Sequence, residues 1–300
     1  MTGRQCPACN RYLDKSSFSS TQWSKGIGVS RCRSCLGHGA SHDATQTARR
    51  NDANEASFTN HALDNPFASG TFRWVAKGTY TVGNRSGQAC VCKWFKTGGV
   101  TEDRFYATDI ATSEKAIELI SKWNAKGLID KMIRVNLPEV WTFKPDSDWG
   151  GRKVMQEPFI ANYQKFNSNT GWSDDTTPWP RVMQALSHFS YHISNGQCLL
   201  CDLQGGVYSD GAVLTDPVIM SATQTYGPTD LGAKGISTFF AHHECNEFCR
   251  SEWSQPRNQT AYYRARAGTS MQVPGRNNGN NHVPTKASRP KMTRMGQIYE

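Results

Sequence analysis

Residues 198–206 read CLLCDLQGG, an apolar run that ends in a carboxylate, an amide and two glycines. A short apolar run bounded by glycines is typical of a buried strand. Asp202 ends that run, and Gln204 is expected on the same face because strand side chains alternate. The stretch LTDP adds Asp216 shortly afterwards. Mg²⁺ prefers such oxygen ligands, so the three side chains form a candidate magnesium site, with an ordinary β-turn as the alternative.

The residues before this strand predict an antiparallel hairpin. Residues 71–83 and 88–96 alternate apolar and polar side chains on either side of the turn sequence GNRSG. Lys93 falls in the middle of the apolar stretch CVCKWFK. A buried lysine is costly unless a phosphate or carboxylate lies nearby. We therefore expect an anion beside Lys93, with a surface lysine that extends its stem along the sheet as the alternative.

Helical spacing occurs in three later stretches. Residues 113–124 and 179–192 have apolar positions three and four apart, and residues 236–253 are expected to form a closing helix. Strands that come first and helices that come later favour an α+β domain with two lobes. Gly232 and Gly235 stand just before the closing helix, where backbone N–H groups and a helix N-terminus can meet an anion.

The closing helix carries a candidate zinc site. Cys245 and Cys249 are four residues apart and would share a helical face, and a neighbouring histidine would supply a third ligand. His188 lies on an apolar helix and is the candidate for the fourth ligand, with a core histidine bonded to other groups as the alternative. Regular helical geometry would place His242, rather than His243, on the face of the two cysteines.

A second group of cysteines lies near the N-terminus. Their spacing is C-x2-C, 22 residues and C-x2-C, which is typical of two knuckles that hold one tetrahedral zinc. We predict a zinc module over residues 1–38, because so short a segment needs a metal to offset its chain entropy. Four unrelated buried cysteines are the alternative. The ligands would be Cys6, Cys9, Cys32 and Cys35.

Most of the formal net charge of +9 lies near the C-terminal end of the 300-residue chain. Residues 254–300 contain eight Lys or Arg and one acidic residue, so the other residues together are nearly neutral. This distribution favours a disordered basic arm over a specific nucleic-acid site. Binding of nucleic acid through this arm or through the zinc module is the alternative.

The chain has no stretch long and apolar enough for a membrane helix, and its start lacks the apolar segment of a signal peptide. We expect a soluble protein of the cytoplasm without a membrane partner, with the nucleus as the alternative location. Its ten cysteines are then not expected to form disulfides.

Several of these stretches together resemble the alpha-kinase family of atypical protein kinases. ALSHFSYH, LLCDLQGG, LTDP, YGPTDLGAKG and FFAHHECNEFC occur in the order and spacing of that family, and EPFIANYQKFNSNTGW resembles its hinge segment. The resemblance implies a two-lobed, protein-kinase-like catalytic domain over residues 66–256. We then expect a linker over residues 39–65 and a basic tail over residues 257–300.

The resemblance also implies a protein serine/threonine kinase that transfers the γ-phosphate of ATP with the help of Mg²⁺. Threonine is the favoured acceptor, protein substrates are the implied partners, and the tail offers hydroxyls for self-phosphorylation. By resemblance Asp202 is the catalytic aspartate, Lys93 is a catalytic residue that binds the ATP phosphates, and Gln204 and Asp216 hold magnesium. A catalytically inactive kinase fold that acts in protein or nucleic-acid binding is the alternative.

Further residues are assigned by the resemblance alone. Glu157 and Phe159 would hold adenine at the hinge. The implied phosphate-binding residues also include Arg73, Gly232 and Gly235. A structural zinc is implied for His188, His243, Cys245 and Cys249, with His243 chosen from the family pattern H-x-C-x3-C. Thr229 and Asp230 stand where the family commonly has Gly and Asn, and we expect a carboxylate there to repel the phosphates.

Overall fold

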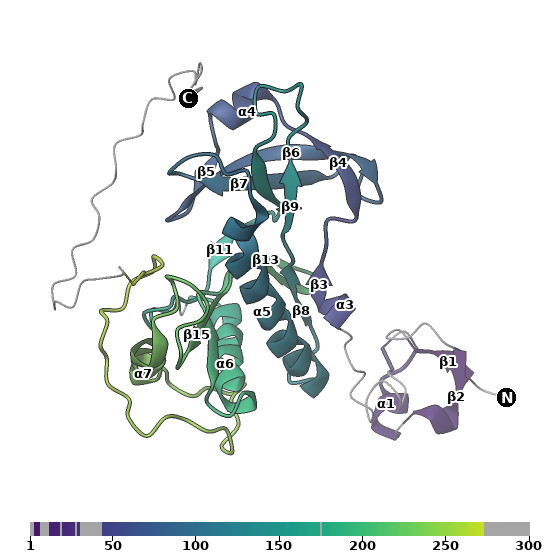
Figure 1. Ribbon diagram of the computed structural model, residues 1–300. Coiled ribbons are helices and arrows are strands. Elements are labelled where there is room, and N and C mark those ends of the chain that lie inside the picture. Colours follow the sequence, from purple (N-terminus) through teal and green to yellow (C-terminus); the bar gives the residue numbers. More distant parts are fainter. Residues whose placement is uncertain are drawn as a thin grey trace.

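The computed structural model describes residues 3–6, 12–18, 20–27, 29–30, 44–174 and 176–272. The described chain comprises a small N-terminal unit and a larger domain that contains two main sheets (Figure 1). Among the described residues, no helix is both long enough and apolar enough to span a bilayer.

The N-terminal unit is built on a short antiparallel hairpin. Its elements are β1 (Gly3–Gln5), β2 (Tyr12–Asp14), η1 (Lys15–Ser17) and α1 (Ser20–Ser24). Cys6 and Phe18 are buried together in a small core. Cys9, Cys32 and Cys35 lie outside the described residues, so the four-cysteine zinc module stays a prediction.

Six antiparallel strands form the upper sheet of the larger domain. In spatial order they are β4 (Ala53–Ser57), β6 (Arg73–Gly83), β7 (Ala89–Phe95), β10 (Lys153–Pro158) and β9 (Glu139–Thr142), with β5 (Ala68–Ser69) paired to β6. The predicted hairpin is confirmed, since β6 and β7 pair along their length and Val75 lies opposite Lys93. Trp94 and Trp149 pack edge to face at 5.0 Å in the core beside this sheet.

Five strands form the lower sheet, in which antiparallel and parallel neighbours are mixed. In spatial order they are β11 (Gln164–Lys165), β13 (Gln204–Tyr208), β14 (Gly211–Leu214), β8 (Met132–Asn136) and β3 (Ala48–Arg49). Two long helices, α5 (Ala107–Lys126) and α6 (Pro178–Ile193), contribute to the largest core of the molecule together with this sheet. Trp123 of α5 meets Phe189 of α6 there at 5.6 Å.

A third layer lies beyond α6. It contains the antiparallel pair β12 (Cys198–Cys201) and β15 (Val218–Ser221) and the helix α7 (Gly232–His242), whose apolar residues share a separate core. Figure 1 shows this layer beside the lower sheet, opposite the upper sheet. The expected strand over residues 198–206 is thus confirmed at its apolar end, and its polar end continues into β13 of the lower sheet.

The expected linker over residues 39–65 was wrong from residue 44 onward. This segment forms α3 (Ala44–Thr47), β3, β4 and α4 (Asn60–Asp64). β3 extends the lower sheet by pairing with β8, and β4 closes the far side of the upper sheet by pairing with β6. Both are edge strands, so they need few apolar residues, and their polar composition concealed them from the sequence pattern.

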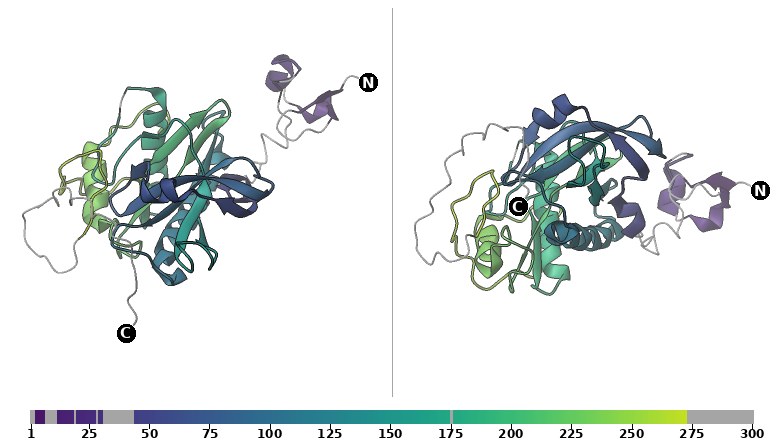
Figure 2. Two further views of the ribbon diagram at one scale, coloured as in Figure 1. Left: turned by 90° about the horizontal axis from the view of Figure 1, so that it is seen from above. Right: turned by 45° about the horizontal axis from the view of Figure 1, so that its top comes forward.

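The expected boundary at residue 256 also differs from the structure. Residues 257–272 lie along the third layer in both views of Figure 2, and the backbone N–H of Tyr262 donates to the Thr238 hydroxyl of α7 at 2.9 Å. The helices differ at their ends as well. α5 begins at Ala107, six residues before the predicted start, and α7 ends at His242 rather than at residue 253.

Candidate active site

Lys93 stands where the two main sheets meet. Its ammonium group forms an ion pair with Glu157 of β10 and lies 2.7 Å from the Asp216 carboxylate, which follows β14. Lys93 and Glu157 come to the same face because β7 and β10 pair in a register that places them diagonally. The Lys93 side chain is 6% exposed and that of Glu157 is 2% exposed. The expectation of an anion beside Lys93 is therefore confirmed, with two carboxylates as the anions.

A second layer of hydrogen bonds fixes this ion pair. Thr215 accepts from the Lys93 ammonium at 3.1 Å and donates to Glu157 at 2.7 Å. The Asn136 amide donates to the same carboxylate at 2.9 Å. Glu157 is thus engaged with Lys93 through its side chain, and its predicted place at an adenine-binding hinge stays a prediction. The sequence did not single out Thr215, which follows β14, or Asn136 at the end of β8, because threonine and asparagine are common at such positions.

Burial and neighbouring charges have opposite effects on the pKa values of Lys93 and Asp216. Burial acts to lower the pKa of Lys93, but the charges of Asp216 and Glu157 outweigh it, and the pKa lies above its usual value. Burial acts to raise the pKa of Asp216, and the neighbouring Lys93 ammonium outweighs it, so that pKa is lowered. The cation and the carboxylate are therefore both charged near neutral pH, although Asp216 keeps 43% of its side chain exposed.

Asp202 lies at the junction of β12 and β13 with its side chain 1% exposed. Its carboxylate accepts from the Lys165 ammonium at 2.8 Å and from the Asn169 backbone N–H at 3.3 Å. Burial raises the pKa of Asp202 above its usual value, and the Lys165 charge only partly opposes this effect. Lys165, on β11, is a site residue that no motif of the sequence singled out.

Asp202 and Asp216 share an unusual backbone conformation. Their φ angles are 58° and 46°, in the left-handed region that side chains with a Cβ seldom adopt. Aspartate tolerates this region better than most residues, and such conformations occur most often at functional sites. Each aspartate turns the chain at the end of a strand, and in doing so places its carboxylate in the group around Lys93 and Lys165.

Gln204 connects the two halves of the site. Its amide oxygen accepts from Lys165 at 3.1 Å, and its amide nitrogen donates to the Asp216 backbone carbonyl at 3.3 Å. Hydrogen bonds and ion pairs therefore run without a break from Lys93 through Asp216, Gln204 and Lys165 to Asp202. The predicted trio of Asp202, Gln204 and Asp216 is brought together by the fold.

Arg73 and Phe159 lie at the border of this group. The Arg73 guanidinium is paired with Asp109 of α5 at 2.6 Å, and its charge also contributes to the lowered pKa of Asp216. The Phe159 carbonyl accepts from both terminal nitrogens of Arg49 at 3.2 Å, and its ring lies 4.1 Å from the Lys77 ammonium. Neither residue contacts Lys93 through an interaction that the structure records.

Gly232 and Gly235 were expected just before the closing helix, but both lie within α7, of which Gly232 is the first residue. Gly232 adopts a left-handed φ of 66° at the start of α7. Gly235 packs so closely that an added Cβ would lie 2.3 Å from the Met220 sulfur. The backbone of the loop before α7 is shaped by Asp230, whose buried carboxylate accepts from Gly232 N–H at 3.0 Å and from Ser221 N–H and hydroxyl at 2.9 and 2.7 Å.

The expected repulsion between Asp230 and phosphates stays a prediction, and the structure shows how the Asp230 carboxylate is held. The Asp230 side chain is fully buried, and all of its described contacts are with donors of its own loop and β15. Asp230 therefore holds the loop together, and these hydrogen bonds satisfy its buried carboxylate. Neighbouring Thr229 contributes its backbone carbonyl to Asn169 at 3.0 Å.

The predicted zinc ligands come together behind α6 and α7. One ligand atom from each of His188, His243, Cys245 and Cys249 lies within 4.8 Å of all the others. Because α7 ends at His242, His243 adopts an extended backbone and leaves the helical phase. This early helix end is the physical reason that His243, and not His242, joins the two cysteines.

These distances fit a tetrahedral metal. His243 Nε2 lies 3.2 Å from His188 Nδ1, and the Cys245 sulfur lies 3.7 and 3.8 Å from those two nitrogens. Zn–N bonds of about 2.0 Å and Zn–S bonds of about 2.3 Å give tetrahedral edges of roughly 3.3 to 3.8 Å. Burial lowers the pKa of both imidazoles, that of His243 to about 4, which keeps their nitrogens free to bind a metal. His188 Nε2 meets the Ser254 carbonyl at 3.2 Å, which orients the ring.

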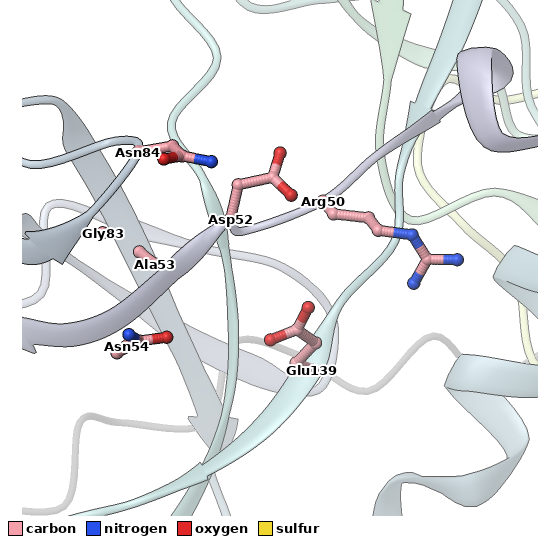
Figure 3. A pocket seen from close by; sticks show the side chains of 7 residues that line it. All are labelled: Arg50, Asp52, Ala53, Asn54, Gly83, Asn84 and Glu139. Atoms are coloured by element: carbon pink, nitrogen blue, oxygen red, sulfur yellow. The ribbon is translucent and has the colours of Figure 1, made fainter.

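An open pocket elsewhere on the domain does not belong to this site. It lies where the β3–β4 connection approaches the β6–β7 turn and β9 (Figure 3). Its lining residues are Arg50, Asp52, Ala53, Asn54, Gly83, Asn84 and Glu139. The set contains none of the predicted site residues.

The alpha-kinase family's sequence model matches residues 68–249, which is more than half of the chain. The chain belongs to the alpha-kinase family. The match contains Lys93, Asp202, Gln204, Asp216 and the histidine–cysteine cluster. It leaves out β3, β4 and residues 250–272, which are nevertheless part of the folded domain.

This alpha-kinase is similar to curated proteins of Dictyostelium discoideum. It is 42% identical to alpha-protein kinase vwkA over 96 residues, or 31% of this chain and 15% of that protein. It is 33% identical to alpha-protein kinase 1 over 190 residues, or 61% of this chain and 13% of that protein. The chain thus spans less than a sixth of the length of these relatives.

Solved structures show the same fold. An alpha-kinase from Entamoeba histolytica covers 69% of this chain with a TM-score of 0.56, and 82% of that structure is covered, at 23% identity. The alpha-kinase domain of myosin heavy chain kinase A in complex with AMPPCP matches 65% of this chain with a TM-score of 0.55. The match includes 85% of that structure, also at 23% identity. The predicted mixture of helices and strands in a kinase-like domain is therefore confirmed.

Proposed function

We propose that this alpha-kinase transfers the γ-phosphate of ATP to hydroxyl groups of proteins, with threonine favoured. The observation that carries the proposal is the connected group of charges from Lys93 to Asp202. Phosphoryl transfer needs a cation at the phosphates and a carboxylate at the acceptor hydroxyl, and it depends mainly on positioning and charge neutralisation. The group supplies one of each, linked by Asp216, Gln204 and Lys165.

Lys93 binds the ATP phosphates in this proposal. Its ammonium group is fixed by Glu157 and Thr215 and already bridges to Asp216. The partly exposed Asp216 carboxylate and the adjacent Gln204 amide offer the hard oxygen ligands that suit Mg²⁺, which would neutralise phosphate charge when bound. Arg73, Gly232 and Gly235 would complete the phosphate surroundings, and the segment of Glu157 and Phe159 would hold adenine through its backbone.

Asp202 receives the proton of the acceptor hydroxyl. Its buried carboxylate holds a proton more readily than an exposed aspartate does, as the raised pKa indicates. Lys165 keeps the carboxylate oriented during the transfer. Zinc, held by His188, His243, Cys245 and Cys249, would have four protein ligands and no open position, so its role is structural.

The test is the transfer of labelled γ-phosphate from ATP to a generic basic protein, with and without Mg²⁺. Asp216→Asn is compared with the matched control Asp210→Asn, which changes an exposed aspartate paired with Arg134 on the surface. We expect Asp216→Asn to lower the rate by about 10² or more. The Asp216 carboxylate is both a proposed magnesium ligand and the partner of Lys93, and the substitution removes its charge. Asp210→Asn should match wild type.

Two results would contradict the proposal. One is the absence of transfer by folded, zinc-loaded wild type in the presence of Mg²⁺ and ATP. The other is transfer that Asp216→Asn leaves unchanged, since the phosphate-binding site would then lie elsewhere.

A further inference from the structure

Residues 266–272, here called the docked segment, reach the centre of the site. The Thr269 hydroxyl donates to Asp202 Oδ2 at 2.7 Å. It thus occupies the position, at hydrogen-bond distance from the catalytic carboxylate, that an acceptor hydroxyl must take in phosphoryl transfer. Thr269 is remote in sequence from Asp202, so the path of the chain after the zinc cluster brings the two together.

Asn169 holds the residue next to Thr269. Its side-chain oxygen accepts from Ser270 N–H at 2.9 Å, and its side-chain nitrogen donates to the Ser270 carbonyl at 2.8 Å. The amide thus pairs with the Ser270 backbone as a neighbouring strand would. Asn169 is fully buried, and its own backbone N–H donates to Asp202, so one residue orients both the carboxylate and the docked segment.

Both ends of the docked segment are also fixed. Arg266 N–H donates to the Thr170 hydroxyl at 3.2 Å, and that hydroxyl donates to the Arg266 carbonyl. Gln272 N–H donates to the Pro228 carbonyl, and its side-chain amide donates to the Asp230 carbonyl, each at 2.7 Å. The docked segment is thus bound through backbone groups of Arg266, Ser270 and Gln272, as expected for a peptide that is recognised by its main chain.

We infer that Thr269 is a phosphorylation site that this kinase modifies in cis, with the docked segment bound as its own substrate peptide. The inference rests on the proposed function. In the reaction a bond forms between Thr269 Oγ1 and the γ-phosphorus, and the bond from that phosphorus to the β–γ bridging oxygen breaks. ADP leaves, and the Thr269 hydroxyl proton passes to Asp202 Oδ2.

The neighbouring Ser270 provides an internal contrast. It also carries a hydroxyl, but its recorded contacts with Asn169 are made by the backbone, whereas Thr269 reaches Asp202 with its side chain. The geometry therefore selects Thr269 over the hydroxyl one residue away.

The experiment maps phosphorylated residues by mass spectrometry in the full chain after timed incubation with Mg²⁺ and ATP. The reaction is run over about a hundredfold range of protein concentration, because a cis reaction keeps its first-order rate constant on dilution and a trans reaction does not. The variants are Thr269→Val, Thr269→Ser, Ser270→Ala and Asp202→Ala. Transfer to a generic basic protein is measured in parallel.

We expect phosphate at Thr269 in wild type and in Ser270→Ala, with a rate constant that stays within about twofold on dilution. Thr269→Val should lose this phosphate yet still modify the generic protein, which shows that it is folded. Thr269→Ser should regain it at residue 269, and Asp202→Ala should lose both activities.

The inference is overturned if the generic protein is phosphorylated while Thr269 stays unmodified, or if the rate constant at Thr269 falls in proportion to dilution. An absence of transfer to any acceptor would instead overturn the proposed function on which the inference rests. The parallel assay therefore separates the two failures.

Discussion

Lys93 is a buried cation held by carboxylates from two different parts of the fold. Glu157 belongs to the upper sheet and Asp216 follows a strand of the lower sheet, so one ammonium group joins the two. Removing one partner of such a buried pair leaves an uncompensated charge and typically costs about 3–5 kcal/mol. The ion pairs of Lys93 thus contribute to stability, and in the proposed function the same residue also binds phosphate; variants can separate the two contributions.

Lys93→Met should have a free energy of unfolding about 3–5 kcal/mol below that of wild type, because Glu157 is left buried without its cation. The double variant Lys93→Met with Glu157→Gln should recover most of this stability and none of the kinase activity. Denaturant unfolding and γ-phosphate transfer are the measurements, and Lys122→Met on the exposed face of α5 is the control. A double variant as unstable as Lys93→Met would refute the electrostatic explanation.

Asp202 gives the site a defined pH dependence. Its pKa in the folded protein lies above the ordinary 3.8 because of burial. The folded state then binds this proton more tightly than the unfolded state, so the contribution of Asp202 to stability falls as pH rises from about 3.8 through the raised pKa. The carboxylate form needed to accept a proton appears over the same interval.

We expect kcat/KM to rise with pH along an acidic limb whose midpoint lies above 3.8. We also expect the stability of Asp202→Asn relative to wild type to increase with pH over this interval, since the variant has no carboxylate to desolvate. Rate profiles and urea unfolding at several pH values test both. If the stability difference between Asp202→Asn and wild type stays constant with pH, burial does not raise the pKa of Asp202.

Among the elements, those with continuous apolar patterns were predictable and those at edges or helix ends were not. The β6–β7 hairpin and α6 followed from periodicity, because both bury whole faces. β8 and β9 follow each other closely in the sequence, yet β8 joins the lower sheet and β9 the upper, since the chain crosses between the sheets at Leu137 and Pro138. The end of α7 at His242 had no local sequence signal, and only the family pattern pointed to His243.

The cluster of His188, His243, Cys245 and Cys249 lies where the chain after α7 meets α6, and a zinc ion held there would join the two. We expect Cys245→Ser to lose one equivalent of zinc per chain and to melt at a markedly lower temperature, because binding of a structural zinc contributes directly to folding. Cys90→Ala, which changes a buried cysteine of β7, should keep the wild-type zinc content. Elemental analysis and thermal unfolding provide the readouts. Retention of full zinc by Cys245→Ser would exclude this residue as a ligand.

At the scale of the whole molecule, the catalytic domain extends beyond the stretch that carries the family motifs. Arg49 on β3 donates to Asn136 on β8 and to the Phe159 carbonyl after β10, so it ties the two sheets together. Asn51 is fully buried and donates to the Gln156 carbonyl at 3.0 Å. Sequence reasoning placed these polar residues in a linker because their burial depends on partners about a hundred residues away.

A chain that begins at residue 44 should therefore fold and melt close to the full chain, whereas one that begins at residue 66 should melt at least about 10 °C lower or fail to fold. The shorter chain lacks β3 and β4 and leaves the edges of β8 and β6 unpaired. The melting temperatures of the two shortened chains and the full chain are measured by circular dichroism during thermal unfolding. Equal melting temperatures would mean that residues 44–65 add nothing to the fold.

The candidate site itself was largely predictable, since Lys93, Asp202, Gln204 and Asp216 stand in recognisable stretches. Lys165 on β11 and Thr215 after β14 were not, because lysine and threonine are common residues and only the folded arrangement shows what they contact. Thr269 lay in the expected tail, and its contact with Asp202 arises from the path of the chain after the histidine–cysteine cluster.

The most direct test of the central claim is the rate of γ-phosphate transfer to a generic basic protein by wild type and by Asp202→Asn, with equal zinc content and a cooperative unfolding transition verified first. We expect the variant to be slower by about 10²–10⁴, the usual contribution of a positioned acid–base group. Equal rates in the two proteins would contradict the assignment of Asp202, and with it the location of the active site.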